Sequence, residues 1–163
     1  MELIQKLLSD GHYQLALFIG CECYLGLNSE NILQIKWGDL TSGHSFKIKD
    51  TKTQKVIDLH ICNGLKELIT CCYQKAGKPE NETSCFQGTD EKVLTKGKLR
   101  KIFDDIKEDY SLGVGKLSPD SFRVVFGRHI LEKYEPRQEM ALCVLSQMFN
   151  HPNIGYTRSY LGI

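Results

Sequence analysis

Arginine is absent from the first 99 residues of this 163-residue chain. All five arginines lie beyond that point: Arg100, Arg123, Arg128, Arg137 and Arg158. Total charge is nearly balanced, with 21 lysines and arginines against 20 acidic residues and a pI near 7.6. A surface for an anionic partner must therefore be local, and composition neither requires nor excludes nucleic acid.

The sequence also lacks a membrane span, a secretion signal and the usual metal or hydrolase motifs. Glu2 interrupts the amino-terminal apolar run, and no later apolar stretch approaches the length of a span. The seven cysteines form no Cys-x-x-Cys pair, and His60 and Cys62 supply at most two metal ligands. Gly-x-Ser-x-Gly and His-Glu-x-x-His are both missing. We expect a cytoplasmic protein, in a bacterial or host cell, with reduced thiols, no metal, no cofactor and no membrane contact.

Hydrophobic periodicity predicts a mostly helical α+β fold in a single domain spanning residues 1–163. Alternating residues predict strands over 46–49 and 56–59 joined by a polar hairpin tip, and a third antiparallel strand near Asp39. Ser118 and Pro119 look like a helix start, as a capping hydroxyl followed by proline. Helices are expected over about 3–8, 13–24, 65–72, 99–106, 118–134 and 136–149, with short ones near residue 32 and at the end of the chain.

The last stretch of the chain, residues 150–160, carries a histidine and a tyrosine around a proline. Pro152 suits the first turn of a helix, where a missing N–H costs nothing. His151 would then lie at the helix mouth and Tyr160 about two turns deeper. Taken alone, Tyr160 could simply pack the tail onto the protein; near the end of a short helix it could also be presented to a partner.

Four segments, in order, resemble the sequence boxes of the tyrosine recombinases, the phage integrase family. They are residues 26–40, 52–59, 120–127 and 150–160. The last is similar to that family's Gly-His-x-x-x-x-x-Thr-x-x-Tyr signature, with Asn150 in place of the glycine. The resemblance implies the family's catalytic domain, and we expect the N-terminal DNA-clamping domain to be missing from this chain.

The resemblance also implies roles for four residues in metal-free phosphodiester chemistry. Tyr160 matches the nucleophile that forms a 3′-phosphotyrosine link, and Arg123 matches the second phosphate-clamping arginine. Lys52 matches the hairpin lysine that protonates the leaving 5′ oxygen, and His151 the histidine that hydrogen-bonds the phosphate. Considered singly, Arg123 could instead form a surface ion pair, Lys52 could be a solvated hairpin lysine, and His151 could cap its own helix.

Two positions depart from the family pattern. Asn28 stands where the first arginine is usual, and Asp120 where a histidine is usual. A guanidinium is a permanent, bidentate cation, whereas an amide is neutral and shorter. Losing one preorganised donor lowers rates by about 10²–10³, and an arginine on a transferring phosphoryl is worth roughly 10³–10⁵. Asp120 would also repel a phosphate, although it could instead favour the dipole of its own helix. Catalysis is therefore expected to be poor.

These observations favour a protein that binds double-stranded DNA but is recombination-deficient, for example a sequence-specific regulator such as a repressor of a phage or mobile element. Two other hypotheses stay open. One is an active recombinase whose missing charge comes from Lys36 or a partner subunit; the other is self-association through the C-terminal helix without DNA contact. The candidate DNA-binding surface comprises Lys36, Lys47, Lys49, Lys52, Lys55, Arg123, Arg128 and Arg158.

Overall fold

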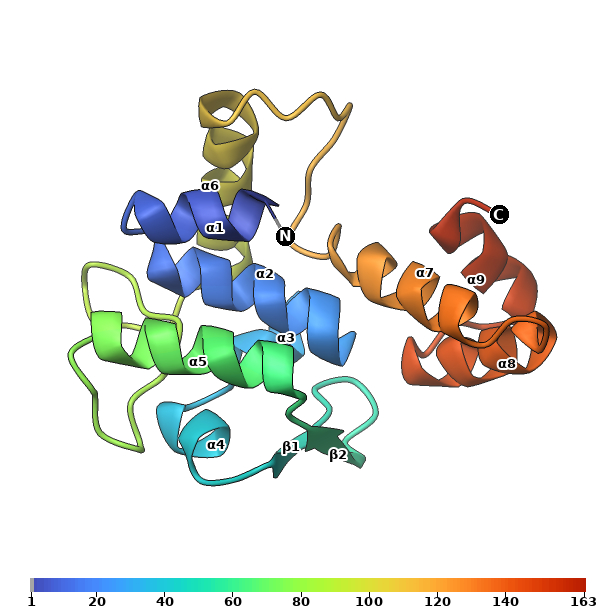
Figure 1. Cartoon of the computed structure of the whole chain (residues 1–163), viewed down its shortest axis with the longest axis horizontal. Coiled ribbons are helices and arrows are strands. Elements are labelled where there is room, and N and C mark those ends of the chain that lie inside the picture. Colours follow the sequence, from blue (N-terminus) through green and yellow to red (C-terminus); the bar gives the residue numbers. More distant parts are fainter. Residues whose placement is uncertain (1) are drawn as a thin grey trace.

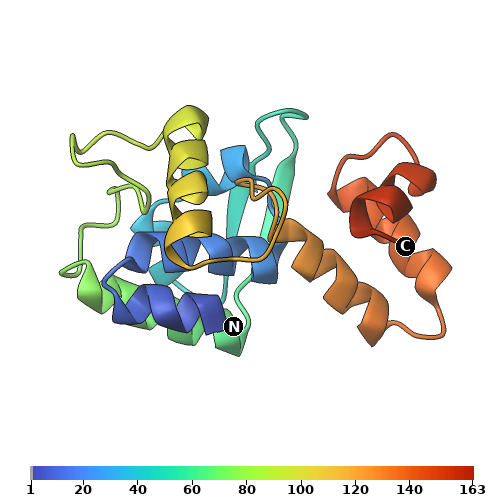
Figure 2. The same ribbon diagram turned by 90° about the horizontal axis from the view of Figure 1, so that it is seen from above.

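The computed structural model describes residues 2–163, which form two groups of elements. Figures 1 and 2 show a larger body that contains the sheet and the helices up to residue 109, and beside it a smaller helical unit that begins at residue 123. The body comprises α1 (Glu2–Ser9), α2 (Tyr13–Leu25), α3 (Ser29–Leu33), α4 (Trp37–Thr41), β1 (Ser45–Lys49), β2 (Val56–His60), α5 (Asn63–Lys75) and α6 (Lys96–Asp109). The smaller unit, which we call the C-terminal helical unit, comprises α7 (Arg123–Lys133), α8 (Gln138–Met148) and α9 (Ile154–Leu161).

The body is built around α2, which is apolar on nearly all sides because other helices surround it. Phe18 of α2 contacts Phe86 and Phe103 edge to face, with ring centroids 5.5 and 5.8 Å apart. Such pairs add stability beyond the area that they bury. Gly20 lets α5 approach, since a Cβ there would lie 2.2 Å from the Leu68 side chain.

The sheet has two strands, so the prediction of three was wrong. β1 and β2 pair antiparallel, with Phe46 opposite Leu59. The expected third strand is α4 instead, because the Asp39 carboxylate accepts a hydrogen bond from the Lys36 amide at 2.9 Å and caps the helix start. The amide of Trp37 donates to the carbonyl of Thr83 at 3.0 Å, so this segment pairs with a loop rather than with β1.

Three predicted helix starts lie too early. The helix predicted from residue 118 begins at Arg123, because the Ser118 amide donates to the Ser121 hydroxyl and forms a separate turn first. The helix predicted from residue 136 begins at Gln138. The terminal helix begins at Ile154 rather than at Pro152. Asn153 is its N-cap, accepting a 2.8 Å hydrogen bond from the Tyr156 amide.

The C-terminal helical unit has its own small hydrophobic cluster, formed by Leu131, Leu142, Leu145, Phe149 and Leu161 among others. Gly127 allows α9 to lie close to α7, since a Cβ there would meet Leu161 at 2.5 Å. α7 joins the unit to the body by packing on α2. At that junction Gly26 adopts the left-handed conformation with φ of 64°, directly against the ring of Phe126.

Candidate functional site

Arg123, the first residue of α7, is held inward by backbone carbonyls. Its side chain is 9% exposed; Nε donates to the Gly26 carbonyl at 2.6 Å and a terminal nitrogen donates to the Met148 carbonyl at 3.3 Å. The guanidinium carbon lies 4.2 Å from the Phe149 ring centroid, a cation–π contact. Burial lowers the pKa of Arg123, while Tyr160 and nearby acids oppose that shift. Arg123 is therefore a buried, preoriented cation and not part of a surface ion pair.

His151 is positioned by the way in which α8 ends. Its amide donates to the Ser146 carbonyl at 2.9 Å, the long hydrogen bond of a Schellman motif. Asn150 provides the left-handed residue that this motif needs, with φ of 56°, which explains how asparagine replaces glycine here. His151 Nδ1 lies 3.0 Å from the Thr157 hydroxyl. The His151 ring therefore contacts the Thr157 side chain of α9. It does not cap the backbone of that helix, because Asn153 is the N-cap.

Tyr160 lies in the last turn of α9, beside His151 and Phe149. The ring centroids are 5.0 Å and 5.6 Å away, respectively, in edge-to-face arrangements. Its hydroxyl donates to the backbone carbonyl of Asp120 at 3.2 Å. Burial raises the pKa of Tyr160 to about 12, against the opposing effect of the Arg123 guanidinium. The structure therefore gathers Arg123, His151 and Tyr160 around Phe149.

The two departing residues meet at the start of α3. Asn28 is its N-cap, accepting a 2.9 Å hydrogen bond from the Asn31 amide. The Asp120 carboxylate accepts a 2.7 Å hydrogen bond from the Ser29 amide. Asp120 therefore binds the amino end of α3. The alternative offered in the sequence analysis, an interaction with the dipole of its own helix, is not the contact that the structure shows. Both side chains act as acceptors for backbone N–H groups, and neither adds a positive charge beside Arg123.

Asp50 and Asn31 hold the hairpin tip that carries Lys52. Asp50 accepts hydrogen bonds from the amides of Thr53 and Lys52 at 2.7 and 3.1 Å and from the Asn31 side chain at 2.6 Å. Asn31 in turn accepts one from the Thr51 amide at 3.0 Å. Burial raises the pKa of Asp50, but these hydrogen bonds outweigh it and the net pKa is lowered. The hairpin is thus anchored to α3, although no sequence motif assigned either residue.

The other predicted basic residues divide into two groups. Within residues 2–163, Lys49, Lys52 and Lys55 are exposed on the hairpin without an ion-pair partner. The remaining ones contact their own chain: Lys36 binds Glu82 at 2.6 Å, Lys47 lies 3.8 Å from Asp58, Arg158 pairs with Glu139, and Arg128 donates to the Leu161 carbonyl at 2.9 Å. Arg128 thereby satisfies the carboxyl end of α9. Among these candidates, and within the part of the chain that the structure describes, Lys49, Lys52 and Lys55 alone have neither an ion pair nor a hydrogen bond for the side-chain ammonium group, and we call them the hairpin lysines.

Glu22 is a buried acid close to the site that sequence reasoning missed. It is 0% exposed, and within the described residues neither carboxylate oxygen has a hydrogen-bond partner. Burial raises the pKa of Glu22 well above its ordinary value, and the charge of Asp120 raises it further. The Phe122 amide and Arg123 lower this pKa, although neither forms a hydrogen bond to the carboxylate. The sequence did contain a signal for this buried acid. Glu22 directly follows the apolar residues 16–21 of a helix that is predicted to lie in the core.

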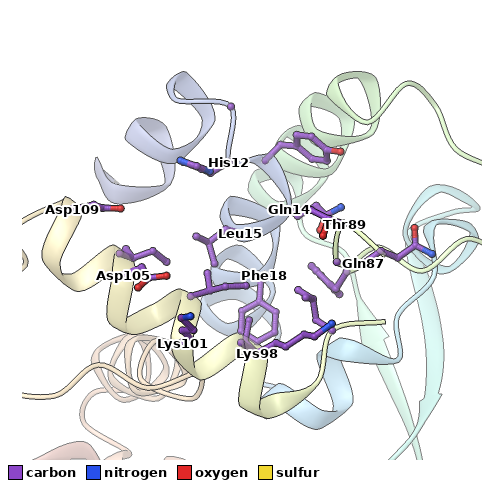
Figure 3. A pocket seen from close by; sticks show the side chains of 18 of the residues that line it. His12, Gln14, Leu15, Phe18, Gln87, Thr89, Lys98, Lys101, Asp105 and Asp109 are labelled. Atoms are coloured by element: carbon purple, nitrogen blue, oxygen red, sulfur yellow. The ribbon is translucent and has the colours of Figure 1, made fainter. Parts of the chain in front are cut away.

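A cavity of about 650 Å³ lies elsewhere, between the start of α2, α6 and the loop around residue 87. Figure 3 shows Phe18 in its floor and Lys98, Lys101 and Asp105 of α6 along its side. Lys98 is bound to Asp90 at 3.1 Å. Arg123, His151 and Tyr160 do not line this cavity, so it is separate from the candidate site.

The sequence matches the family model described as "Phage integrase family" over residues 2–162. This chain belongs to the phage integrase family. No curated protein sequence matches it significantly. The family assignment agrees with the α+β architecture and with the grouping of Arg123, His151 and Tyr160 described above.

Solved structures of tyrosine recombinases share the fold. The crystal structure of XerA recombinase has a TM-score of 0.72 at 14% identity, covering 99% of this chain and 57% of that one. XerH site-specific recombinase, bound to its palindromic difH substrate after cleavage, has a TM-score of 0.67 at 19% identity, covering 98% and 47%. The Tn1549 transposon integrase, in complex with a circular intermediate DNA, has a TM-score of 0.69 at 14% identity, covering 98% and 58%. This chain spans about half the length of these structures.

Proposed function

We propose that this phage integrase family member binds double-stranded DNA and is deficient in strand cleavage, so that it acts as a sequence-specific regulator. The observation that carries the proposal is the use of Asn28 and Asp120 as acceptors at the start of α3. Where two further groups would bind the scissile phosphate, this site offers a neutral amide and a carboxylate. Arg123 remains as the buried cation of the site.

DNA contact in this proposal depends on the hairpin lysines and on Arg123. Lys49, Lys52 and Lys55 are exposed cations, and phosphate contacts of this kind supply most of the affinity for a duplex. The DNA complexes of XerH and of the Tn1549 integrase support this choice of partner. Residues 1–163 would act as one unit equivalent to a catalytic domain, in the cytoplasm of a bacterial or host cell.

Within residues 2–163, no helix is both long and apolar enough to cross a membrane.

An active recombinase is the second candidate, favoured by the preserved arrangement of Arg123, His151 and Tyr160. A protein that only binds DNA has no chemical need for a tyrosine at this position. In that case the missing positive charge comes from a partner subunit or from Lys36. Lys36 would have to leave its 2.6 Å ion pair with Glu82.

Self-association through the C-terminal helix is a further part of the proposal. In this structure α9 packs on its own chain, where Leu161 is completely buried. Tyr156 and Ile163 are nevertheless more than half exposed on and just beyond α9. Sedimentation velocity of the wild-type chain and a Tyr156→Ser, Ile163→Ser variant, with and without DNA, measures this contribution. A monomer under all four conditions contradicts it.

The decisive experiment begins by selecting binding sites from a random duplex library with the purified chain. A nicked suicide substrate containing the selected site is then incubated with the wild type and with Tyr160→Phe. A cleavage-deficient regulator gives a salt-sensitive complex and only trace covalent adduct. Rapid adduct formation by the wild type alone establishes the recombinase instead, and failure to enrich or bind any duplex contradicts both.

A further inference from the structure

Glu22 lies in the last turn of α2, one turn before the residue that accepts a hydrogen bond from Arg123. Glu22 and Gly26 are four residues apart, and their backbones are joined by the last hydrogen bond of α2, at 3.1 Å. Gly26 is the left-handed C-cap of the helix, so the chain turns there toward α7. The Gly26 carbonyl accepts the 2.6 Å hydrogen bond from Arg123 Nε. The carboxyl group of Glu22 is therefore buried one helical turn from the group that orients the guanidinium.

The buried polar groups around this point contain more acids than cations. The charged groups that act on the pKa of Glu22 are Arg123 of α7, which lowers it, and Asp120 of the preceding turn, which raises it. Tyr160 of α9 and Cys23 of α2 are the other titratable groups whose pKa values the charge of Glu22 raises, apart from its neighbour Cys21. If Glu22 and Asp120 are both ionised, one guanidinium balances two carboxylates. A phosphate placed on Arg123 then adds a third negative charge.

We propose that Glu22 is an internal counter-ion of Arg123 that competes with DNA phosphate for its positive charge, so that phosphate binding at Arg123 is coupled to proton uptake by Glu22. This inference rests on the proposed DNA-binding function and identifies the group that regulates it. The ionised form of Glu22 has no hydrogen-bond partner within the described residues and is balanced by Arg123, so a phosphate that takes over Arg123 makes this buried carboxylate costly and drives it to take up a proton. An approaching phosphate favours the neutral form further, because like charges repel strongly at low dielectric constant.

The first test measures binding of a fluorescently labelled duplex by anisotropy at neutral pH. Glu22→Gln removes the competing charge at nearly constant shape and is expected to tighten binding about tenfold, equivalent to one pK unit of coupling. The matched control is Glu132→Gln, which removes the same charge from an exposed position on α7. In an Arg123→Gln background the gain from Glu22→Gln should vanish. Equal tightening by both single variants, or a gain that survives without Arg123, would overturn the proposal.

The second test measures proton uptake, and it does not require the Arg123 variant to fold. Binding enthalpies are measured by calorimetry in buffers of different ionisation enthalpy, which gives the number of protons taken up with the duplex. The wild type and a His151→Gln variant should take up a proton fraction that Glu22→Gln lacks. His151 is the necessary control because its imidazole is a second group beside Arg123 that a phosphate would favour in the protonated form, and burial and Arg123 keep its pKa low in the free protein. Undiminished uptake in Glu22→Gln contradicts the proposal.

Inorganic phosphate separates this inference from the DNA-binding proposal. If no variant binds a duplex, the proposed function fails, and phosphate is titrated against the NMR signal of the Arg123 Nε–H group. Phosphate binding that tightens with Glu22→Gln but not with Glu132→Gln supports the counter-ion role on its own. Identical responses of the wild type and Glu22→Gln, or no response in either, would overturn it.

Discussion

The hydroxyl of Tyr160 donates a hydrogen bond to the backbone carbonyl of Asp120, linking the end of α9 to the turn before α7 at 3.2 Å. The candidate nucleophile is therefore engaged within its own chain. Burial raises its pKa to about 12, so the neutral phenol dominates at physiological pH. Attack on a phosphate would require this hydrogen bond to break and the proton to leave. The hydrogen bond and the raised pKa both slow cleavage by Tyr160.

Tyr160→Phe tests what that hydroxyl contributes. The variant loses one hydrogen bond, so the free energy of unfolding should fall by about 0.5–1.5 kcal/mol, measured by urea denaturation. Affinity for a selected duplex should change less than twofold in anisotropy titrations, because the edge-to-face contacts of the ring with Phe149 and His151 remain. A large loss of DNA affinity would show that the hydroxyl binds DNA directly.

Restoring the two missing groups should increase cleavage. Asn28→Arg combined with Asp120→His supplies a second guanidinium and removes a carboxylate, and adduct formation on a suicide substrate should rise by roughly 10³ or more. The free energy of unfolding should fall at the same time, by about 1 kcal/mol for the lost N-cap of α3.

The matched control for this restoration is Asn28→Lys combined with Asp120→His. It restores the charge without a bidentate donor, so its gain should be clearly smaller. If neither pair increases cleavage while Tyr160 remains in place, the arrangement around Arg123 does not support phosphoryl transfer.

The hairpin lysines should carry a salt-dependent part of DNA affinity. Replacing Lys49, Lys52 and Lys55 by glutamine should weaken binding and reduce the slope of log affinity against log salt by about 0.9 for each phosphate that the variant no longer neutralises. A second triple variant controls for total charge, with the same change at exposed lysines of α5 and α6: Lys66, Lys75 and Lys101. Equal reductions in affinity for both triple variants would assign the effect to net charge rather than to the hairpin.

Asp50 should make stability depend on pH in the acid range. Hydrogen bonds hold its pKa below the unfolded-state value of about 3.9, so its contribution is complete above that pH and is lost as pH falls through the lower folded-state pKa. Asp50→Asn should lower the free energy of unfolding by about 1–3 kcal/mol at pH 7. The difference from the wild type should shrink toward pH 2 in denaturation curves. A constant difference across this range would contradict the ionised state assigned to Asp50.

The roles assigned to Arg123, His151 and Tyr160 stay predictions, whereas the sequence was sufficient for the family and the fold class. These follow from motif order and from local rules, such as the apolar faces of the helices. The third strand was wrong because the residues around Asp39, read as the opening of a strand, do not reveal that the Asp39 carboxylate caps α4. The start of the terminal helix was misplaced because Asn153 is a stronger N-cap signal than Pro152 is a first-turn signal.

The parts of the site that depend on long-range contacts could not be predicted. Asp120 binds the Ser29 amide, 91 residues away in sequence, and no local pattern encodes that pairing. The same is true of Glu22, whose importance comes from α7 packing against α2. Sequence reasoning considered Asp120 only in relation to phosphate and to its own helix, and therefore missed its actual partner.

The division of the molecule into two hydrophobic clusters has a mechanical consequence. Lys52 is held to the larger cluster through Asp50 and α3, whereas Tyr160 packs on the smaller cluster and His151 contacts Phe149 of that cluster. The separation of Lys52 from these residues depends on how α7 packs on α2, and any rotation there would have to break the hydrogen bonds that Asp120 and Arg123 make across the junction. A stiff, rod-shaped ligand such as a DNA duplex, if it contacted both units, would hold this separation fixed.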